Sequence, residues 1–503
     1  MQDKSTIAEI LFSQRSSITV MCFLAFALHT IMRNVINVAQ VCMLERNNDT
    51  NNVTSSINIR DGEKPKYCRL NKGQLTDYDG NLPWQEQDLD HLIAVLGWGR
   101  LVAVLPISLL ADRFDSAVVL FYAMFSASLS TFLFPVAALL HGYVPTLILR
   151  LVQGMTYGAQ PCLSALITHW SPHNELSSRL IFTLSGQHLS NFLLNIVVAR
   201  FCSLKQIFGG WPIGFLSSGV LGLLWCVFWW KLGANNPEKH EKVSDKEMTK
   251  ILLNREFKME DKKAVIHTFP WCSAIFSKAS LACLLCETSG TFGVACVVYY
   301  FPRYARDVLG LQMYANGLVT GIPNLLEFFC RLSFNFLAEY LRHGCKMNKT
   351  LVMKSFNTFG MFSIALLLYF ATFIDCARRA TAVALIVSAQ ALYGATSPGF
   401  LVSQVLIAPR YAGIMAGWFA LFSSASMIGL PYLVAYLVPD STDVLQWRAV
   451  FGIGCVMQLF SALVFLIYGS ADEQSWAKSS GKLMESKEAA EDFVEKVTDD
   501  GSH

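Results

Sequence analysis

Long apolar stretches separated by polar segments dominate the chain. A helix needs about 20 apolar residues to cross the hydrocarbon of a bilayer, and about twelve stretches here are close to that length. The pattern therefore predicts an all-α, multi-pass membrane protein. We place the membrane spans near residues 18–43, 89–111, 116–139, 144–170, 180–202, 210–232, 278–301, 314–338, 352–374, 380–405, 410–437 and 448–469.

Two of the polar segments are long, and they organise the chain. One, at 44–88, follows the first span, and the other, at 233–277, separates the sixth span from the seventh. We expect a cytosolic N-terminus (1–17), a first six-helix half (18–232) and a cytosolic linker (233–277). A second six-helix half (278–469) and a cytosolic tail (470–503) follow.

Weak sequence repeats indicate that the two halves are related. Asp112 follows the second span and Glu339 follows the eighth, with an offset of 339 − 112 = 227 residues. Trp211 and Trp447 open the sixth and twelfth spans, with an offset of 447 − 211 = 236 residues, and each has a phenylalanine four residues later. Similar offsets in the same order predict two parallel repeats, which in transporters place the substrate site between the halves. We expect Asp112 and Glu339 to have a structural or gating role.

Glycosylation sequons predict the orientation of the chain. Asn48 and Asn52 each begin an Asn-X-Thr sequence in the 44–88 segment, so this loop should lie outside the cell or in an organelle lumen. Both termini are then cytosolic. The basic residues after the eighth span then fall on the cytosolic side, as the positive-inside rule expects; they are Arg342, Lys346 and Lys349. The pair before the tenth span, Arg378 and Arg379, falls on the opposite side and does not follow the rule.

Composition excludes several classes of protein. Only 15% of residues are charged and 53% are hydrophobic, against about 25% charged in soluble domains. A net charge of +3 is too small to suggest a nucleic-acid partner. We find no phosphate-binding loop, zinc-ligand motif or nucleophile elbow, so we expect neither an enzyme nor a bound cofactor or metal. Most of the 14 cysteines lie in apolar runs, but Cys42 and Cys68 flank or lie in the first polar loop and are candidates for a disulfide.

Arg33 is the most informative residue, because it lies inside the first apolar run. A charge at that depth costs at least about 2.5 kcal/mol, and a guanidinium stays protonated. Arg33 therefore either faces an anionic substrate or pairs with a carbonyl or carboxylate of a neighbouring helix. Arg100, in the second span, would add to an electropositive cavity, unless Glu327 neutralises it across the cavity.

Other ionisable residues inside the spans are candidates for ion coupling. Glu327 and Arg331 are four apart and can pair on one helix face, so a structural ion bridge is one interpretation of both. Glu287 has no cationic partner on its own helix. Burial without such a partner favours the protonated carboxyl, so Glu287 either exchanges a proton during transport or is a hydrogen-bonded packing residue. His188 is either a proton relay or a packed polar residue.

An ordered set of motifs resembles the anion–cation symporter family of the major facilitator superfamily, which includes vesicular glutamate transporters, sialin and sodium–phosphate cotransporter-like proteins. The resemblance covers nearly the whole chain. Its motifs are Met32-Arg33, Trp98-Gly99 with Pro106, the RxxQG-like Arg150-Leu151-Val152-Gln153-Gly154, His169-Trp170-Ser171-Pro172, Ile407-Ala408-Pro409-Arg410-Tyr411-Ala412-Gly413 and Trp447-Arg448-Ala449-Val450-Phe451.

This resemblance implies a major facilitator fold and transport of anions driven by protons or sodium. It carries Arg33 and Arg150 over as anion-handling candidates. Arg410 lies in a short cytosolic turn after the tenth span, where we expect it to have a structural or gating role by bonding helix ends; contact with the substrate is the alternative. Two departures matter. The acidic residue that follows RxxQG in glutamate and sialic-acid transporters is Tyr157 here, and the tyrosine after the second-helix glycine is Arg100.

The leading interpretation is a secondary active transporter that moves a small organic or inorganic anion by alternating access. Its expected partners are that anion, a proton or sodium ion and the lipid bilayer, and we expect a monomer in the plasma membrane or a vesicular or lysosomal membrane. The alternative is a receptor or interaction protein that keeps this scaffold but does not transport. The missing acid at Tyr157 and the charge of Arg100 favour this alternative.

We predict that the 44–88 loop is glycosylated at Asn48, Asn52 or both. Glycosidase treatment of the protein expressed in eukaryotic cells should increase its electrophoretic mobility. The Asn48→Gln, Asn52→Gln double variant should run at the deglycosylated position without treatment. An unchanged mobility of the wild type after treatment would contradict the orientation proposed above.

Overall fold

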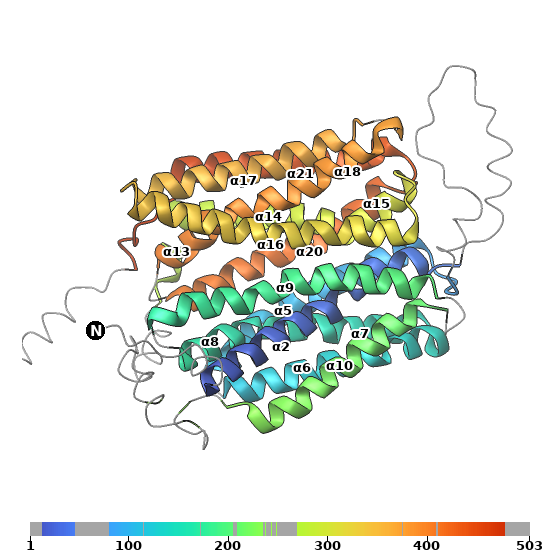
Figure 1. Ribbon diagram of the computed structural model, residues 1–503, viewed down its shortest axis with the longest axis horizontal. Helices are drawn as coiled ribbons and strands as arrows, with labels where there is room; N and C mark the ends of the chain where they lie inside the picture. Colours follow the sequence, from blue (N-terminus) through green and yellow to red (C-terminus); the bar gives the residue numbers. More distant parts are fainter. Residues whose placement is uncertain are drawn as a thin grey trace, which may run out of the picture.

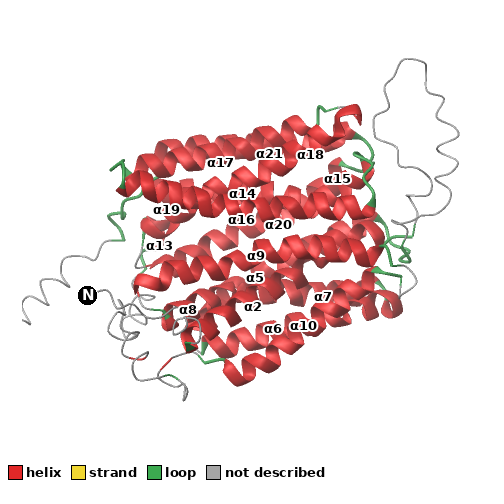
Figure 2. Cartoon of the chain, in the orientation of Figure 1, coloured by secondary structure: helices red, strands yellow, loops and turns green. Residues whose placement is uncertain are grey.

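The computed structural model of this chain describes residues 13–45, 80–113, 115–171, 173–204, 209–234, 269–374, 376–408 and 411–477, with the single residues 237, 243 and 248. Within these residues the secondary structure is helical, apart from one isolated bridge between Leu44 and Leu82 (Figure 2). Helices satisfy their backbone hydrogen bonds internally, as a bilayer requires.

The first half consists of six long helical rods. Some rods contain short 3₁₀ or π segments, labelled η. In chain order the rods are α2 (Gln14–Ala39) with η1 (Gln40–Cys42); α5 (Glu86–Arg113); α6 (Ser116–Val136) with η3 (Ala137–His141); α7 (Tyr143–Thr156) with η4 (Tyr157–Ala159) and α8 (Gln160–Trp170); α9 (His173–Cys202); and α10 (Trp211–Leu232).

The second half repeats this arrangement after the short helix α13 (Trp271–Ile275). Its six rods are α14 (Lys278–Ala295) with η6 (Cys296–Tyr300) and α15 (Phe301–Asp307); α16 (Met313–His343); α17 (Lys349–Ala371); η7 (Cys376–Arg378) and α18 (Arg379–Tyr393) with η8 (Gly394–Thr396), η9 (Ser397–Leu401) and α19 (Val402–Leu406); α20 (Ala412–Leu437); and α21 (Val444–Tyr468). The predicted two halves of six helices are confirmed.

The halves meet along two pairs of helices. Helix α9 packs against α16, and α5 packs against α20. Figure 1 shows the blue-to-green helices of the first half on one side of this interface and the yellow-to-red helices of the second half on the other. These two contacts, together with smaller ones between α2 and η6 and between η1 and α15, form the interface between the halves.

The tryptophans that mark the sequence repeat occupy matching places. Trp211 begins α10 and Trp447 lies in the first turn of α21, and neither side chain is exposed. Each contacts the phenylalanine four residues later, with ring centres 5.8 Å apart for Trp211 and Phe215 and 6.0 Å apart for Trp447 and Phe451. The two indole nitrogens donate to Asn81 Oδ1 and to the Ser441 carbonyl. The repeated residues thus have the same packing role in both halves.

Glycines allow α5 and α7 to approach closely. A Cβ at Gly99 would collide with the Leu151 carbonyl, and a Cβ at Gly154 would collide with the Leu96 carbonyl. Small residues at helix contacts are typical of membrane bundles, where packing provides much of the association energy. This contact fixes the two helices that carry Arg100 and Tyr157.

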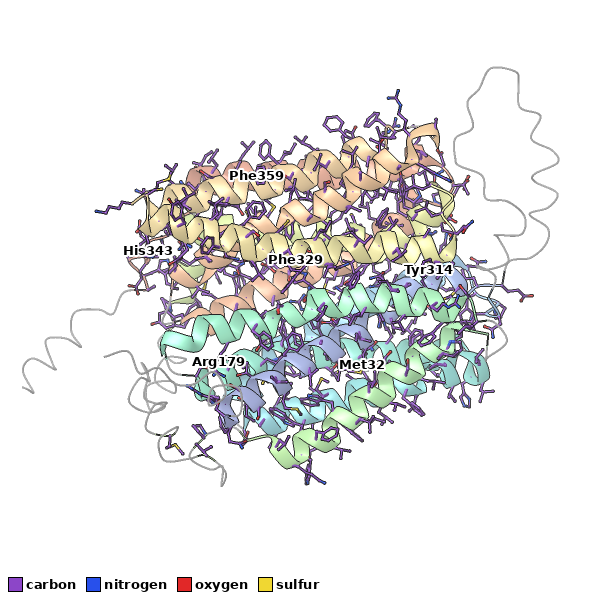
Figure 3. All side chains as sticks on the ribbon, in the orientation of Figure 1. Met32, Arg179, Tyr314, Phe329, His343 and Phe359 are labelled. Atoms are coloured by element: carbon purple, nitrogen blue, oxygen red, sulfur yellow. A yellow bond between two sulfur atoms is a disulfide. The ribbon has the colours of Figure 1, made fainter. Side chains whose placement is uncertain are left out.

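Large apolar side chains cover much of the outside of the bundle. Phe329 and Phe359, labelled in Figure 3, are 54% and 47% exposed. Nine helices within the described ranges meet the length and composition of a membrane span. An apolar exterior of this kind matches immersion in lipid, and the protein is an integral, multi-pass membrane protein.

The structure gives Cys42 a different disulfide partner from the predicted Cys68. Cys42 is bonded to Cys202, 160 residues away, with 6.1 Å between their Cα atoms. Cys42 ends η1 and Cys202 ends α9, and these two ends lie together because α2 packs along α9. The pairing with Cys68 was wrong because the prediction rested on proximity in sequence. Cys68 itself, with Asn48 and Asn52, lies outside the described residues.

Candidate functional site

Arg33 and Arg100 meet at a single aromatic ring. The Arg33 guanidinium carbon lies 4.3 Å from the centre of the Tyr157 ring, and that of Arg100 lies 4.4 Å from it. Arg33 comes from α2, Arg100 from α5 and Tyr157 from the first residue of η4. A ring face attracts cations, more strongly where water is excluded. The structure therefore brings together two predicted substrate residues and the position where related transporters have an acid.

Neither guanidinium is paired with a carboxylate in the described part of the chain. Arg33 Nε donates to Asn34 Oδ1 at 3.2 Å, and Arg100 Nη1 approaches Met427 Sδ at 3.2 Å. The two arginines are only 7% and 8% exposed. Each guanidinium has five N–H donors, so both retain donors for a ligand. The Met427 contact also places Arg100 at the interface with α20.

Neutral polar groups surround the ring. His29 stacks near Tyr157 with ring centres 5.8 Å apart, and its Nε2 lies 3.2 Å from Thr156 Oγ1.

Glu287 is half-buried and accepts a hydrogen bond of 3.1 Å from Gln404 Nε2. It also interacts electrostatically with Arg100 and Arg331. Glu287 thus lies near Arg100 and Arg331 without forming an ion pair among the described residues.

Arg150 has a different environment from Arg33 and Arg100. It is 2% exposed, donates from Nε to the Leu92 carbonyl at 3.2 Å and bonds to Gln153. Gln153 in turn donates to the Met32 carbonyl at 2.6 Å and to Thr131 Oγ1 at 2.8 Å. These contacts tie α7 to α2, α5 and α6. Arg150 therefore holds helices together, and we do not include it in the proposed anion site.

A second charged cluster lies on α16. Arg331 donates to Glu327 Oε1 from Nε at 2.9 Å and from Nη2 at 2.7 Å, as the spacing of four residues predicted. Glu327 Oε2 accepts from Gln390 Nε2 at 3.1 Å and lies 3.6 Å from His188 Nδ1. Because His188 belongs to α9, this cluster joins the two halves. The alternative of Glu327 paired with Arg100 is not what the structure shows.

The predicted gating residues are only partly described. Glu339 is exposed and pairs with Arg342 at 3.3 Å and His343 at 2.9 Å on its own helix. The backbone of Asp112 lies in the last turn of α5, but its side chain lies outside the described part, as does Arg410. The structural or gating role of these three residues stays a prediction.

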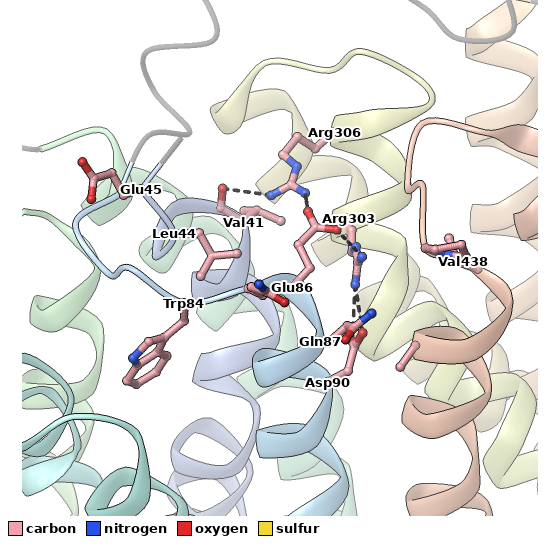
Figure 4. Close-up of a pocket in the computed structure, with 13 residues that line it drawn as sticks. Val41, Leu44, Glu45, Trp84, Glu86, Gln87, Asp90, Arg303, Arg306 and Val438 are labelled. Carbon is pink, nitrogen blue, oxygen red and sulfur yellow. Dashed lines mark hydrogen bonds and ion pairs between the residues drawn. The ribbon is translucent and has the colours of Figure 1, made fainter. Parts of the chain in front are cut away.

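The sequence reasoning missed a cluster of four charged residues that ties the halves together. Arg303 Nη1 lies 3.2 Å from Asp90 Oδ2, and Arg303 Nη2 also pairs with Glu86. Arg306 Nη2 lies 2.9 Å from Glu86 Oε1. Figure 4 shows the arginines of α15 reaching toward the acids of α5. This set, which we call the gate cluster, lies where the 44–88 loop joins the bundle. Glu86 and Asp90 are four residues apart, and Arg303 and Arg306 are three apart. These spacings place each pair on one helix face, and they were the signal in the sequence that could have revealed the cluster.

The gate cluster lines a cavity of about 410 Å³ at this end of the bundle. Asp90 and Arg303 are 1% and 4% exposed, so their charges are removed from water. Breaking a buried ion pair by removing one partner is strongly destabilising, because a buried charge is left alone. The cluster is therefore suited to hold the two halves together at this end.

Two parallel six-helix halves are typical of one class of membrane transporters, whose substrate sites lie at the interface between the halves. The family model of the Major Facilitator Superfamily matches residues 22–429. The chain belongs to this superfamily.

Similar proteins agree with this assignment. Human sialin is 25% identical over 480 residues, covering 94% of this chain and 93% of sialin. A putative inorganic phosphate cotransporter of Drosophila ananassae is 25% identical, covering 92% of this chain and 93% of the relative. These relatives match the anion–cation symporter resemblance and are transporters, not enzymes. The xylose transporter XylE from E. coli shares the fold, with a TM-score of 0.63 at 16% identity over 93% of this chain and 99% of XylE.

We predict that Arg303→Gln lowers the thermal stability of the purified protein, because it leaves Asp90 buried without its cation. Loss of a buried partner costs roughly 3–5 kcal/mol. Adding Asp90→Asn should recover part of the loss, since neither buried site then carries an unpaired charge. Thermal unfolding of the wild type, both single variants and the double variant measures this. Additive losses in the double variant would contradict the direct pairing.

Proposed function

We propose that the protein is a secondary active transporter that carries a small anion across the membrane by alternating access, with a proton or sodium ion as the driving ion. The carrying observation is that Arg33 and Arg100 converge on Tyr157 without a carboxylate partner among the described residues. Permanent cations inside a membrane protein need an anionic or polar partner. A transported anion supplies the missing charge.

The chemistry of the site supports carboxylate or phosphate as the group recognised. Guanidinium groups bind both through paired, charge-assisted hydrogen bonds. Tyr157, His29 and Thr156 add an aromatic surface and neutral polar atoms beside the arginines. The names of relatives, sialin and an inorganic phosphate cotransporter, favour the same classes of anion.

The gate cluster supports alternating access. We infer that Glu86, Asp90, Arg303 and Arg306 close the end next to the 44–88 loop, which we propose faces the outside or a lumen. Transport then requires these ion pairs to separate, so that the anion site opens to that side. The substrate is released to or taken from the opposite, cytosolic side when the gate cluster is formed.

A driving ion needs a group other than the acid that Tyr157 replaces. Glu287 is our candidate because it lies near Arg100 and is held by a neutral amide from Gln404. When Glu287 is ionised it competes with the substrate for Arg100. When it is protonated Arg100 is left for the anion. Proton uptake and anion binding would then favour each other.

Uptake into proteoliposomes is the direct test of this function. Purified protein should accumulate labelled phosphate, sialic acid or another small carboxylate under an imposed proton or sodium gradient, relative to protein-free vesicles. Uptake of none of these anions under any gradient would contradict transport. Anion-induced thermal stabilisation without uptake would instead support the alternative, a receptor on this scaffold.

We predict that Arg33→Ala abolishes anion uptake while leaving folding and membrane insertion intact, because it removes a cation of the site. Arg33→Lys should also be impaired, since a point charge does not replace the paired donors of a guanidinium. The matched control is Arg200→Ala, at an exposed arginine in the last turn of α9, which should transport like the wild type. Normal uptake by Arg33→Ala would remove Arg33 from the anion site.

We predict that Glu287→Gln makes uptake insensitive to an imposed pH gradient, because the amide keeps the shape of the side chain and cannot titrate. Exchange of internal for external anion should persist, since exchange requires the site but not the driving ion. Uptake and exchange in proteoliposomes at two external pH values measure both. A Gln variant that concentrates anion under a pH gradient as well as the wild type would exclude Glu287 from coupling.

A further inference from the structure

A chain of buried polar side chains leads from Arg33 into the other half of the protein. Arg33 Nε donates to Asn34 Oδ1 at 3.2 Å. Asn34 Nδ2 donates to Asn191 Oδ1 at 2.8 Å. Asn191 Nδ2 donates to Asn324 Oδ1 at 3.3 Å. These contacts begin at the proposed anion site on α2, pass through α9 and reach α16.

The chain continues to the charged cluster on α16. Gln390 Nε2, from α18, lies 3.4 Å from Asn324 Oδ1 and 3.1 Å from Glu327 Oε2. Glu327 is bonded to Arg331 and lies beside His188. One continuous set of side chains therefore joins Arg33 to Glu327. Arg33 is the member of this set that we place in the anion site.

Burial makes these contacts consequential. Asn34, Asn191 and Asn324 are 3%, 3% and 4% exposed, and Gln390 is 1% exposed. A buried amide that loses its hydrogen-bond partner destabilises the fold, and hydrogen bonds in a low-dielectric network strengthen one another. The Asn191–Asn324 contact also crosses the interface between the halves. A change in bonding at Arg33 or at Glu327 therefore alters the hydrogen bonds of the amides between them.

We propose that Asn191 and Asn324 are positioning residues that couple the anion site at Arg33 to the Glu327–Arg331–His188 cluster. Through Asn34 they hold the Arg33 guanidinium in place while the two halves are in this arrangement. An anion that captures Arg33 changes the bonding of Asn34 and so the cross-interface contact. This coupling rests on the proposed function, and it assigns to the amides a role in timing the movement of the halves.

The same interface supplies a matched control. Thr320 Oγ1, on α16, donates to Asn195 Oδ1 of α9 at 3.0 Å. This contact is also buried and also crosses between the halves, one helical turn from Asn324. Among the described residues its side-chain hydrogen bonds do not lead to Arg33, because Asn195 Nδ2 donates to the backbone carbonyl of Asn191. Thr320→Val removes a cross-interface hydrogen bond without cutting the chain.

The test is a double-variant cycle measured in three backgrounds: the otherwise wild-type protein, Asn324→Leu and Thr320→Val. Arg33→Lys and Glu327→Gln are made singly and together, and the KM for anion uptake and the melting temperature of the purified protein are measured for each. Otherwise wild-type protein should show non-additive effects, of roughly threefold or more in KM, as coupled residues do. The same cycle in Asn324→Leu should be additive, and in Thr320→Val it should remain non-additive.

Each outcome separates the two proposals. Additive effects in all backgrounds, or non-additive effects that survive Asn324→Leu, overturn the coupling while leaving the anion site in place. Loss of coupling in Thr320→Val as well as in Asn324→Leu shows a general effect of loosening the interface, which also overturns it. If the wild type takes up no anion, the proposed function falls, and the melting-temperature cycle still decides whether the chain of amides couples its two ends.

Discussion

Two permanent cations, neither of them paired with a carboxylate among the described residues, are the constraint on which the centre of this protein depends. Arg33 and Arg100 are nearly buried and contact the same Tyr157 ring. Burial of a guanidinium is tolerated only where dipoles, ring faces or an anion replace water. The interrupted fourth rod, the close contact of α5 with α7 and the amides of α2 all serve to hold these groups in place. In the function proposed above, an anion is the ligand that completes the arrangement.

Buried polar and charged side chains join the two halves of the protein. The gate cluster joins α5 to α15, and the amide chain joins α9 to α16. Such contacts are strong when fully satisfied and unfavourable when partly broken. They therefore favour discrete arrangements of the halves over a continuum. This is the physical property that alternating access requires.

Two departures from related transporters turn out to be neighbours. Arg100 replaces a tyrosine, Tyr157 replaces an acid, and in the structure the new arginine lies on the new ring. Each change alone is unfavourable for a transport site, because Arg100 adds a buried charge and Tyr157 removes a carboxylate. Together they form a cation–aromatic contact that leaves the site more positive than a site with an acid. In the function proposed above, the pair strengthens anion binding, and any coupling role falls to Glu287 or another group.

The sequence alone determined the helices and their grouping into halves, because hydrocarbon imposes one length and one backbone solution on every span. It also identified Arg33, Arg100 and the Glu327–Arg331 pair, since a charge in an apolar run and a spacing of four residues are local signals. Contacts between distant segments were decided by the tertiary structure. Cys42 pairs with Cys202, Arg303 with Asp90 and Asn191 with Asn324, and Arg150 bonds to the Leu92 carbonyl and to Gln153. These depend on which helix faces meet, and helix packing is set by side-chain shape along the whole interface, which no local pattern in the chain encodes.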